Sequence, residues 1–180
     1  MDDLKIEIIQ AESAAEIRGE LAQIEASKAR AAVLFVENFA ENSDEKFYEE
    51  LERFPLPVVL GLKAKACEKF VDACHLCVAA ESAEIGEFSA AEALQKGLIN
   101  KIAPIEKVEA ESLALAEKIS RMAPLAVRAA LRAVTEGLKV PLKEGLKLET
   151  ELFARIFSTA DMREGTRAFL EKRRPHFQGK

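Results

Sequence analysis

The stretch Ser89–Ile102, SAAEALQKGLINKI, contains the start of a helix, its end and the strand that follows. Ser89 and Glu92 form a capping box, in which each side chain accepts a hydrogen bond from the other residue's backbone N–H. Gly97 marks the end of the helix, because glycine adopts the left-handed closing conformation without a steric penalty. Leu98–Ile102 then has the apolar character of a short strand. The stretch predicts a helix leading directly into a strand, as in α/β proteins.

Strand and helix patterns also alternate in the residues before Ser89. The predicted strands lie at residues 4–9, 31–36, 58–60 and 76–80, and the predicted helices at residues 13–28, 44–54 and 67–74. The run Ala31–Val36 is apolar at every position, which is typical of a strand covered on both faces in a parallel sheet. This alternation predicts an α/β domain with parallel pairing.

Everything after Pro104 has helical periodicity, with helices expected at residues 108–121, 125–137, 143–157 and 163–172. The apolar residues between Leu146 and Phe157 occupy more than one stripe of their helix. The second face of such a helix usually packs against another subunit. We therefore divide the chain into an α/β core, residues 1–103, and a C-terminal helical oligomerisation region, residues 104–180.

Composition excludes several classes of protein. The chain has 180 residues, of which 49% are hydrophobic and 32% are charged, as in soluble globular domains. Its formal net charge of −5 argues against nucleic-acid binding, which normally requires a basic surface. No run approaches the roughly 18 apolar residues of a membrane span, and the first residues lack the features of a signal peptide. We expect a cytoplasmic protein that binds neither nucleic acid nor membranes.

The three cysteines, Cys67, Cys74 and Cys77, are an odd number in a chain large enough to fold without disulfides, which fits a reducing compartment. Cys74 and Cys77, with His75 between them, have the spacing of a metal-binding or redox dithiol, but the sequence contains no second such pair. Free cysteine usually packs as a small buried apolar residue, so no metal site is predicted.

Five motifs, in order along the second half of the chain, resemble the enoyl-CoA hydratase/isomerase (crotonase) superfamily. They are SAAEAL at 89–94, GLIN at 97–100, APLA at 123–126, FSTAD at 157–161 and FLEKR at 169–173. The resemblance implies a crotonase-like fold, in which a spiral core of ββα-type units with a parallel sheet is followed by C-terminal trimerisation helices. It also implies a homotrimer or a dimer of trimers, with a full-length crotonase homologue as a further candidate partner.

The resemblance continues upstream with lower similarity, and it is this part that carries the candidate site residues. Cys67-Glu68 stands where the family has a glycine trio followed by Cys-Glu, which implies that Glu68 is a catalytic acid/base. Glu87 is the candidate for the second carboxylate, and Lys65 and Ala66 are the candidates for polarising the thioester carbonyl. The family's C-terminus implies that Lys172, Arg173 and Arg174 contact the phosphates of coenzyme A; the alternative is a solvated helix end.

The sequence departs from the family pattern in three places. Ala64-Lys65-Ala66 replaces the glycines before Cys67, and Glu87 follows Gly86 directly where the family has Gly-x-Pro-Glu. The segment 37–43, where the family has its other oxyanion loop, contains no glycine. Two backbone N–H groups aimed at the thioester oxygen are worth about 3 kcal/mol each. All three departures remove parts of an active-site cleft and leave the scaffold.

Three functions therefore stay open. The first is a degenerate crotonase-superfamily subunit without hydratase activity, which assembles with its partners or binds an acyl thioester carried on coenzyme A or an acyl carrier, with no resident cofactor. The second is an active, divergent hydratase, isomerase or decarboxylase that uses Glu68. The third is a structural homo-oligomer without a ligand. For Glu68 itself, the alternative to catalysis is an exposed glutamate in the first turn of a helix, where the helix dipole favours negative charge.

Overall fold

The computed structural model describes residues 5–25, 27–39 and 43–180. Leu4, at the start of the first predicted strand, and residues 40–42 of the glycine-free segment lie outside the described residues. In chain order the elements are β1 (Ile6–Gln10), α1 (Ala14–Glu25), β2 (Ala31–Phe39), α2 (Glu45–Glu52), β3 (Val58–Ala66), α3 (Glu68–Ala73), β4 (Leu76–Ala80), β5 (Glu84–Ile85), β6 (Phe88–Ser89), α4 (Ala90–Lys96), β7 (Lys101–Ala103), a 3₁₀ turn (Ile105–Lys107), α5 (Val108–Ser120), α6 (Pro124–Gly137), α7 (Leu142–Ile156) and α8 (Ala160–Leu170).

The sheet has the strand order β1-β2-β3-β4-β7, and every pair along this path is parallel. The short strand β5 pairs in parallel with the end of β3, and β6 pairs antiparallel with β5. The predicted α/β class and parallel pairing are confirmed. Because parallel strands all end at one edge of a sheet, the loops that follow them gather there.

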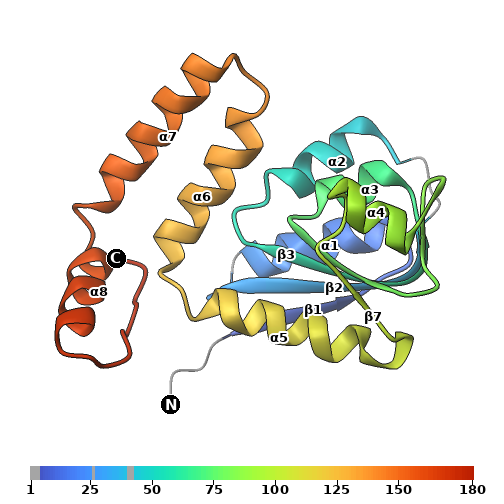
Figure 1. Ribbon diagram of the computed structural model, residues 1–180, viewed down its shortest axis with the longest axis horizontal. Coiled ribbons are helices and arrows are strands. Elements are labelled where there is room, and N and C mark those ends of the chain that lie inside the picture. Colours follow the sequence, from blue (N-terminus) through green and yellow to red (C-terminus); the bar gives the residue numbers. More distant parts are fainter. Residues whose placement is uncertain (1–4, 26, 40–42) are drawn as a thin grey trace. The chain divides into compact units, whose positions relative to one another are not determined.

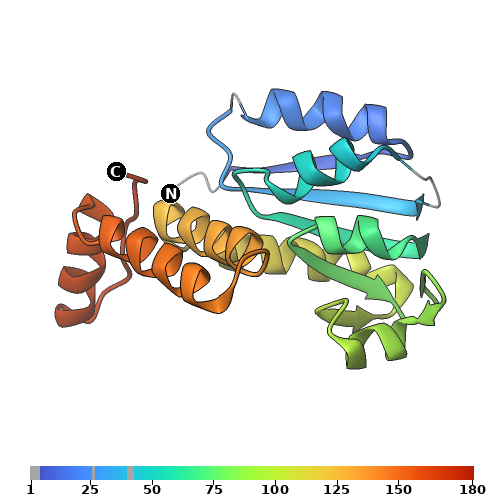
Figure 2. The ribbon, with the colours of Figure 1, turned by 90° about the horizontal axis from the view of Figure 1, so that it is seen from above.

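Helices cover both faces of this sheet (Figures 1 and 2). Buried side chains of α1, α2 and α3, among them Ile17, Leu51 and Phe70, form one cluster with Leu34 and Leu60 of the central strands. The opposite face carries α5, whose buried Ser112 lies against Gly61 of β3. A sheet buried on both faces explains why β2 reads as a continuous apolar run.

The helix boundaries follow the capping signals. At Ser89 the hydroxyl accepts from the N–H of Glu92, the Glu92 carboxylate accepts from the N–H of Ser89, and Gly97 closes the helix with φ of 78°. The predicted capping box and glycine cap are confirmed. Ser13 and Glu16 have the same spacing, which also predicts a capping box, but only half of it forms. The Ser13 hydroxyl accepts from the N–H of Glu16, whereas the Glu16 carboxylate accepts from the N–H of Glu12 and not from that of Ser13.

The strand predicted at 98–102 is β7 at 101–103, because the N–H of Leu98 donates to the Ala93 carbonyl at 2.9 Å and so belongs to the closure of α4. Asn100 ties the segment between them to β4. Its side-chain oxygen accepts from the N–H of Cys77 at 2.8 Å, and its own N–H donates to the Cys77 carbonyl at 3.0 Å. The hairpin β5–β6 and the continuation of β3 from Gly61 to Ala66 were not predicted. These last two differences matter most, since they lie where the candidate site residues were placed.

The chain divides into two compact units, residues 1–118 and residues 119–180. The sequence had placed the start of the oligomerisation region earlier, at Pro104. In the second unit α6 and α7 form an antiparallel helical hairpin, followed by α8 and an extended tail (Figure 1). The buried Asp161 carboxylate fixes this tail by accepting the N–H groups of Gln178 and Gly179 at 2.7 and 2.8 Å. Within the described ranges, no helix has the length and apolar character needed to cross a membrane.

Candidate functional site

Glu68 and Glu87 come to one corner of the first unit. Glu68 is the first residue of α3, and Glu87 lies in the turn between β5 and β6. Gly86, beside Glu87 in that turn, has φ of 59°, and a Cβ placed on it would lie 2.5 Å from Oε1 of Glu68. The Glu68 side chain therefore packs against the turn that carries Glu87. Both glutamates are exposed.

The contact between Glu68 and Gly86 predicts a larger stability loss for Gly86→Ala than for Gly97→Ala. Both glycines have positive φ, which costs alanine about 1–2 kcal/mol. Nothing lies within 4 Å of a Cβ at Gly97, whereas one at Gly86 would also meet Cγ of Glu68 at 2.8 Å. Chemical denaturation should show an excess cost of about 1 kcal/mol at Gly86, because Glu68 must change rotamer. In a protein that also carries Glu68→Ala, Gly86→Ala should no longer show this excess. If Gly86→Ala costs the same stability with and without Glu68, the contact is disproved.

Asp72 is a carboxylate near Glu68 that the sequence analysis did not single out. It lies four residues after Glu68, one turn further along α3. Burial raises the pKa of the Asp72 carboxyl, and the charges of Glu68 and Glu52 raise it further. The i, i+4 spacing of two acidic residues was the available signal. The structure thus places a carboxyl with a raised pKa beside Glu68.

Lys65 and Ala66 lie in the last part of β3, which is paired on both sides. Lys65 is aligned with Asn38 of β2 and with Glu84 of β5, and its ammonium group lies 3.1 Å from the Glu84 carboxylate. The Ala66 carbonyl accepts the N–H of Gly86 at 2.8 Å, and the next N–H, that of Cys67, donates to Phe39 at 3.0 Å. Hydrogen-bonding groups of the segment matched to the family's glycine trio are thus used within the sheet.

The helix α3 packs on a cluster of aromatic side chains through its buried Phe70. The ring of Phe70 stacks on that of Phe39 with centroids 3.9 Å apart, and Phe47 stacks beside them. Above them the Tyr48 hydroxyl lies 3.6 Å from Sγ of Cys67, and burial, together with the contact to Cys67, raises the pKa of Tyr48. This packing fixes the helix that presents Glu68.

The other two cysteines are buried, and so is much of the histidine between them. Burial raises the pKa of the Cys77 thiol to about 12, and it raises the pKa of Cys74 as well. A metal ligand or nucleophile must be a thiolate, so these shifts disfavour both roles. Cys74 and Cys77 pack as apolar core residues.

Arg173 is held by carboxylates of its own unit. Its guanidinium pairs with Glu164 at 2.6 Å and with Glu171 at 2.6 Å. The pairing lowers the pKa of Glu164 to about 2, aided by the N–H of His176, and raises that of Arg173. Lys172, with φ of 53°, lies just after α8, and both Lys172 and Arg174 are exposed. The structure thus engages the middle member of the predicted phosphate-binding trio in local ion pairs.

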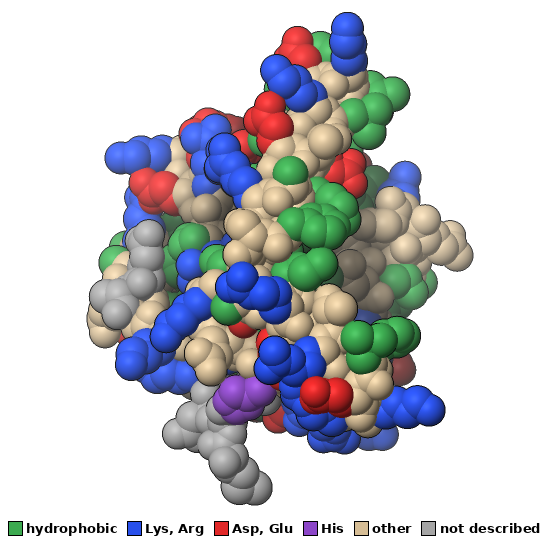
Figure 3. Space-filling view, turned by 90° about the vertical axis from the view of Figure 1, so that its left-hand side faces the viewer, with side chains coloured by type: hydrophobic (Ala, Val, Ile, Leu, Met, Phe, Trp, Pro, Cys, Tyr) green, Lys and Arg blue, Asp and Glu red, His purple; other side chains and the backbone are tan. Residues whose placement is uncertain are grey.

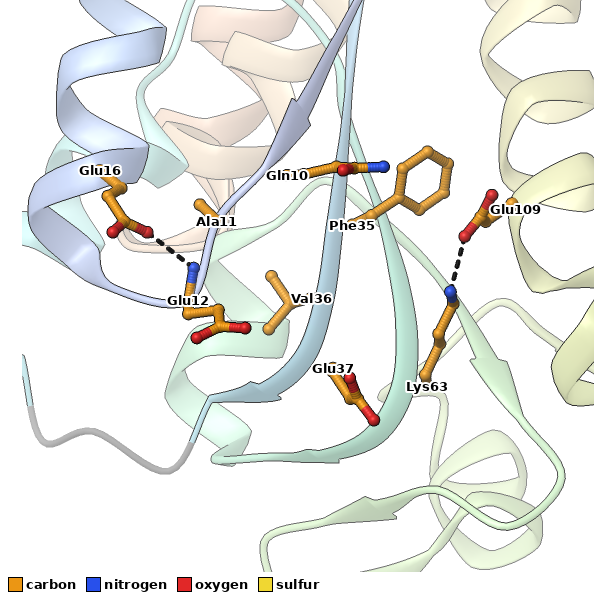
Figure 4. Close-up of a pocket in the computed structure, with 9 residues that line it drawn as sticks. All are labelled: Gln10, Ala11, Glu12, Glu16, Phe35, Val36, Glu37, Lys63 and Glu109. Atoms are coloured by element: carbon orange, nitrogen blue, oxygen red, sulfur yellow. Dashed lines mark hydrogen bonds and ion pairs between the residues drawn. The ribbon is translucent and has the colours of Figure 1, made fainter.

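A cavity of about 450 Å³ opens near the carboxyl ends of β1 and β2, a site that the sequence analysis did not predict (Figure 4). Four of its nine lining residues are acidic, namely Glu12, Glu16, Glu37 and Glu109, and the ammonium group of Lys63 lies 2.6 Å from Glu109. None of the predicted site residues lines it. Four carboxylates and one paired lysine do not favour the phosphates of a nucleotide.

Residues 78–180 match the family model described as "Enoyl-CoA hydratase/isomerase". The chain belongs to this family. The matched residues include Glu87 and the Lys172–Arg174 trio, whereas Lys65, Ala66 and Glu68 precede them. The enoyl-CoA hydratase/isomerase family is therefore identified by the half of the chain where the sequence motifs were clearest.

Two relatives illustrate the extent of the match. The 2,3-dehydroadipyl-CoA hydratase of Escherichia coli is 35% identical over 135 residues, which cover 73% of this chain and 53% of that protein. Enoyl-CoA hydratase EchA19 of Mycobacterium tuberculosis is 41% identical over 92 residues, which cover 51% of this chain and 35% of that protein. The chain spans about a third to a half of the length of these curated relatives.

Solved structures show that the crotonase-like fold extends over the whole chain. An enoyl-CoA hydratase from Polaromonas superimposes with a TM-score of 0.85 at 18% identity, covering 99% of this chain and 98% of that one. A hydratase subunit from Geobacillus kaustophilus gives 0.83 at 24% identity, covering 97% and 95%. The predicted fold is confirmed, and at this identity the likeness concerns the fold alone.

Proposed function

We propose that this member of the enoyl-CoA hydratase/isomerase family is a subunit without hydratase activity that binds an acyl thioester, carried on coenzyme A or on an acyl carrier. The observation that carries the proposal is the strand formed by Lys65 and Ala66. Hydratase chemistry needs backbone N–H groups free to meet the thioester oxygen, each worth about 3 kcal/mol. Here β2 and β5 flank this segment, and the N–H of Cys67 is already bonded to Phe39.

The exposure of Glu68 and Glu87 supports the same proposal. A hydratase acid must hold its proton near neutral pH, which usually requires burial in an apolar pocket. Both side chains are exposed in the first unit, and Lys65, the nearest candidate for polarising a carbonyl, is paired with Glu84. The names of the relatives point to enoyl-CoA thioesters as the class of ligand to test.

The proposal includes an assembly, a homotrimer or a dimer of trimers, with a full-length family member as a further candidate partner. The three unpaired cysteines fit a cytoplasmic location, which is part of the proposal. No resident cofactor is invoked.

A second candidate function, catalysis by Glu68, is favoured by one observation. Glu68 lies against Gly86, next to Glu87, and one helical turn before Asp72, whose pKa is raised. Neighbouring carboxyl groups with different proton affinities can divide the roles of acid and base. An isomerase needs only one such group to move a proton between two carbons.

The test is to measure binding and turnover in the same samples. Isothermal titration with coenzyme A, acetyl-CoA and crotonyl-CoA is expected to show binding. Hydration of crotonyl-CoA should be about 10²–10³-fold slower than by the enoyl-CoA hydratase of Mycobacterium tuberculosis, because the Lys65–Ala66 segment does not supply its oxyanion donor. Glu68→Gln is expected to leave both the affinity and the residual rate unchanged. Glu49→Gln, an exposed glutamate on α2, is the matched control.

Each other outcome selects a different function. Turnover that Glu68→Gln abolishes and Glu49→Gln retains would establish the second candidate and reject the first. A calorimetric signal absent for all three ligands would leave a structural homo-oligomer.

A further inference from the structure

The strand β1 forms one edge of the parallel sheet. It pairs with β2 on one side, and no other strand of the described residues pairs with it. The carbonyl of Lys5 accepts a hydrogen bond from the residue before β2, and the N–H of Ala11 donates to a carbonyl of β2. Backbone groups of successive residues point to opposite sides of a strand, so those of Ile6, Ile8 and Gln10 point away from β2. The outer edge of β1 therefore offers a row of hydrogen-bonding groups to a further strand.

One apolar side chain on this edge is left uncovered. Side chains alternate between the two faces of a sheet, and that of Ile9 is buried with α1 in the core cluster. Ile8 lies on the opposite face and is 53% exposed. The charged Lys5 and Glu7, which pair with each other at 2.8 Å, belong to the face of Ile9. Exposed apolar edge strands pair readily with other strands, so β1 is suited to docking one.

The cavity of about 450 Å³ lies at the carboxyl end of this edge. Gln10, the last residue of β1, lines it next to Phe35 (Figure 4). Its four glutamates and one lysine give the lining a formal charge of −3, and the lysine is already paired with Glu109. Clefts lined by one sign of charge attract groups of the opposite sign. The edge thus leads into a site that favours a positive charge.

The first unit as a whole is acidic. Residues 1–118 contain 24 acidic and 13 basic side chains, a formal charge of −11, whereas residues 119–180 contain 7 acidic and 13 basic side chains, a formal charge of +6. Many lysine and arginine side chains are exposed on the face shown in Figure 3. A partner of β1 meets the acidic unit, and complementary charge speeds association and selects partners. The partner of β1 is therefore expected to be basic.

We propose that β1 and the cavity together bind an extended segment of a partner protein, which adds to the sheet as an antiparallel strand. Main-chain hydrogen bonds with Ile6, Ile8 and Gln10 hold this segment, and its alternate apolar side chains cover Ile8. Antiparallel pairing is slightly more stable per residue than parallel pairing, and it places the amino-terminal end of the added strand beside the carboxyl end of β1. A lysine or arginine at that end enters the cavity and meets its glutamates.

Charge also argues against a second copy of this chain as the occupant. Asp2 and Asp3 precede β1, so an antiparallel second copy would bring two more acidic groups to the glutamates of the cavity. It would also bring together two units of −11 each. The occupant is therefore a different protein, with basic residues before a run of alternating apolar residues. Its binding does not depend on the proposed function, since Glu68 and Glu87 lie outside β1 and the cavity.

The test is the binding of a synthetic peptide to the full chain, measured by fluorescence anisotropy. The probe is the heptapeptide KKVTVTV, labelled at its carboxyl end, which we expect to bind with a dissociation constant below about 1 mM. The peptide EEVTVTV should bind about tenfold more weakly, because its carboxylates meet those of the cavity. Methylation of one alternate set of peptide amide nitrogens should abolish binding, and methylation of the other set should leave it unchanged, because only every second residue bonds to β1.

Variants of the protein locate the site. Ile8→Pro removes an N–H that points away from β2, so it should preserve the pairing of β1 with β2 and weaken peptide binding about tenfold. Glu12→Lys with Glu37→Lys should weaken the binding of KKVTVTV about tenfold and strengthen that of EEVTVTV by a similar factor. Glu49→Lys with Glu81→Lys changes the net charge equally at exposed positions outside the cavity, and it should alter neither affinity by more than about twofold.

The exchange of peptide preference decides the inference even if Ile8→Pro does not fold. The inference is overturned if KKVTVTV does not bind at about 1 mM. Equal effects of the two methylated sets would also overturn it, since attraction by charge alone needs no strand pairing, and so would equal losses of affinity in the two lysine double variants. An assembly of the chain that Ile8→Pro disrupts in the absence of peptide would mean that a second copy, and not a basic partner, occupies the edge.

Discussion

Gly61→Val is expected to lower the free energy of unfolding by about 3 kcal/mol, at the upper end of what overpacking costs. Gly61 lies in the middle of β3 and is aligned with Phe35 of β2. A Cβ at this position would lie 2.6 Å from Cδ1 of Phe35 and 2.9 Å from the hydroxyl oxygen of Ser112 on α5. Phe35 lines the cavity and can turn toward it, but Ser112 is fully buried between α5 and the sheet, so the helix itself would have to shift.

Gly19→Val is the matched control for this substitution. Gly19 lies in α1, and nothing lies within 4 Å of a Cβ placed on it. Valine forms helix better than glycine, so the control should be neutral or stabilising by a few tenths of a kcal/mol. Urea denaturation of both variants gives the comparison. Equal effects at the two positions would show that the close approach of α5 to β3 is not what requires glycine at 61.

The sequence was sufficient to predict the elements whose signals are local. The capping box of Ser89 and Glu92 and the glycine cap at Gly97 are properties of residues within one helix, and both were confirmed. The inward positions of Phe70 and Val71 on α3 follow from helical periodicity, and both side chains are buried. Such signals need no knowledge of distant contacts.

The candidate site was harder to predict because its geometry depends on distant partners. The segment Gly61–Ala66 reads as a loop, since glycine, lysine and alanine are poor strand formers. It becomes a strand because β2 pairs with it on one side and β5 on the other. The sequence likewise placed Arg173 among three basic residues, but only the fold shows that Glu164 and Glu171 hold it.

The distribution of charge along the chain is a different case. The charged residues are visible in the sequence, but their unequal distribution appears only when the structure gives the boundary between the two units. A boundary between residues 118 and 119 divides the charges into −11 and +6. Without that boundary the total of −5 describes an ordinary acidic protein.

His75 should make the stability of the first unit depend on pH. Its Nδ1 accepts the N–H of Val58, at the start of β3, at 3.1 Å. Burial lowers the pKa of His75 from 6.5 to about 4, although the Glu52 backbone and charge oppose the shift. A protonated imidazole has no acceptor at Nδ1, so the bond to Val58 exists only in the neutral form.

The sign of the effect follows from the direction of the shift. The unfolded chain binds a proton at His75 near pH 6.5, and the folded chain does so only near pH 4. Neutral His75 therefore makes its full contribution to the free energy of unfolding above about pH 6.5. This contribution, roughly 3 kcal/mol, is lost as the pH falls to about 4.

His75→Asn should remove this pH dependence, because the asparagine side-chain oxygen can replace Nδ1 as the acceptor but does not titrate. Denaturation at several pH values between 7 and 4 should show the wild type losing about 3 kcal/mol more than the variant. Carboxylates also change their protonation as the pH falls, but both proteins contain the same ones. Their effect therefore cancels when the stability of the variant is subtracted from that of the wild type. His176→Asn, at an exposed position in the C-terminal tail, controls for loss of an imidazole as such. Parallel pH profiles for wild type and His75→Asn would mean that the Val58 bond does not depend on a neutral imidazole.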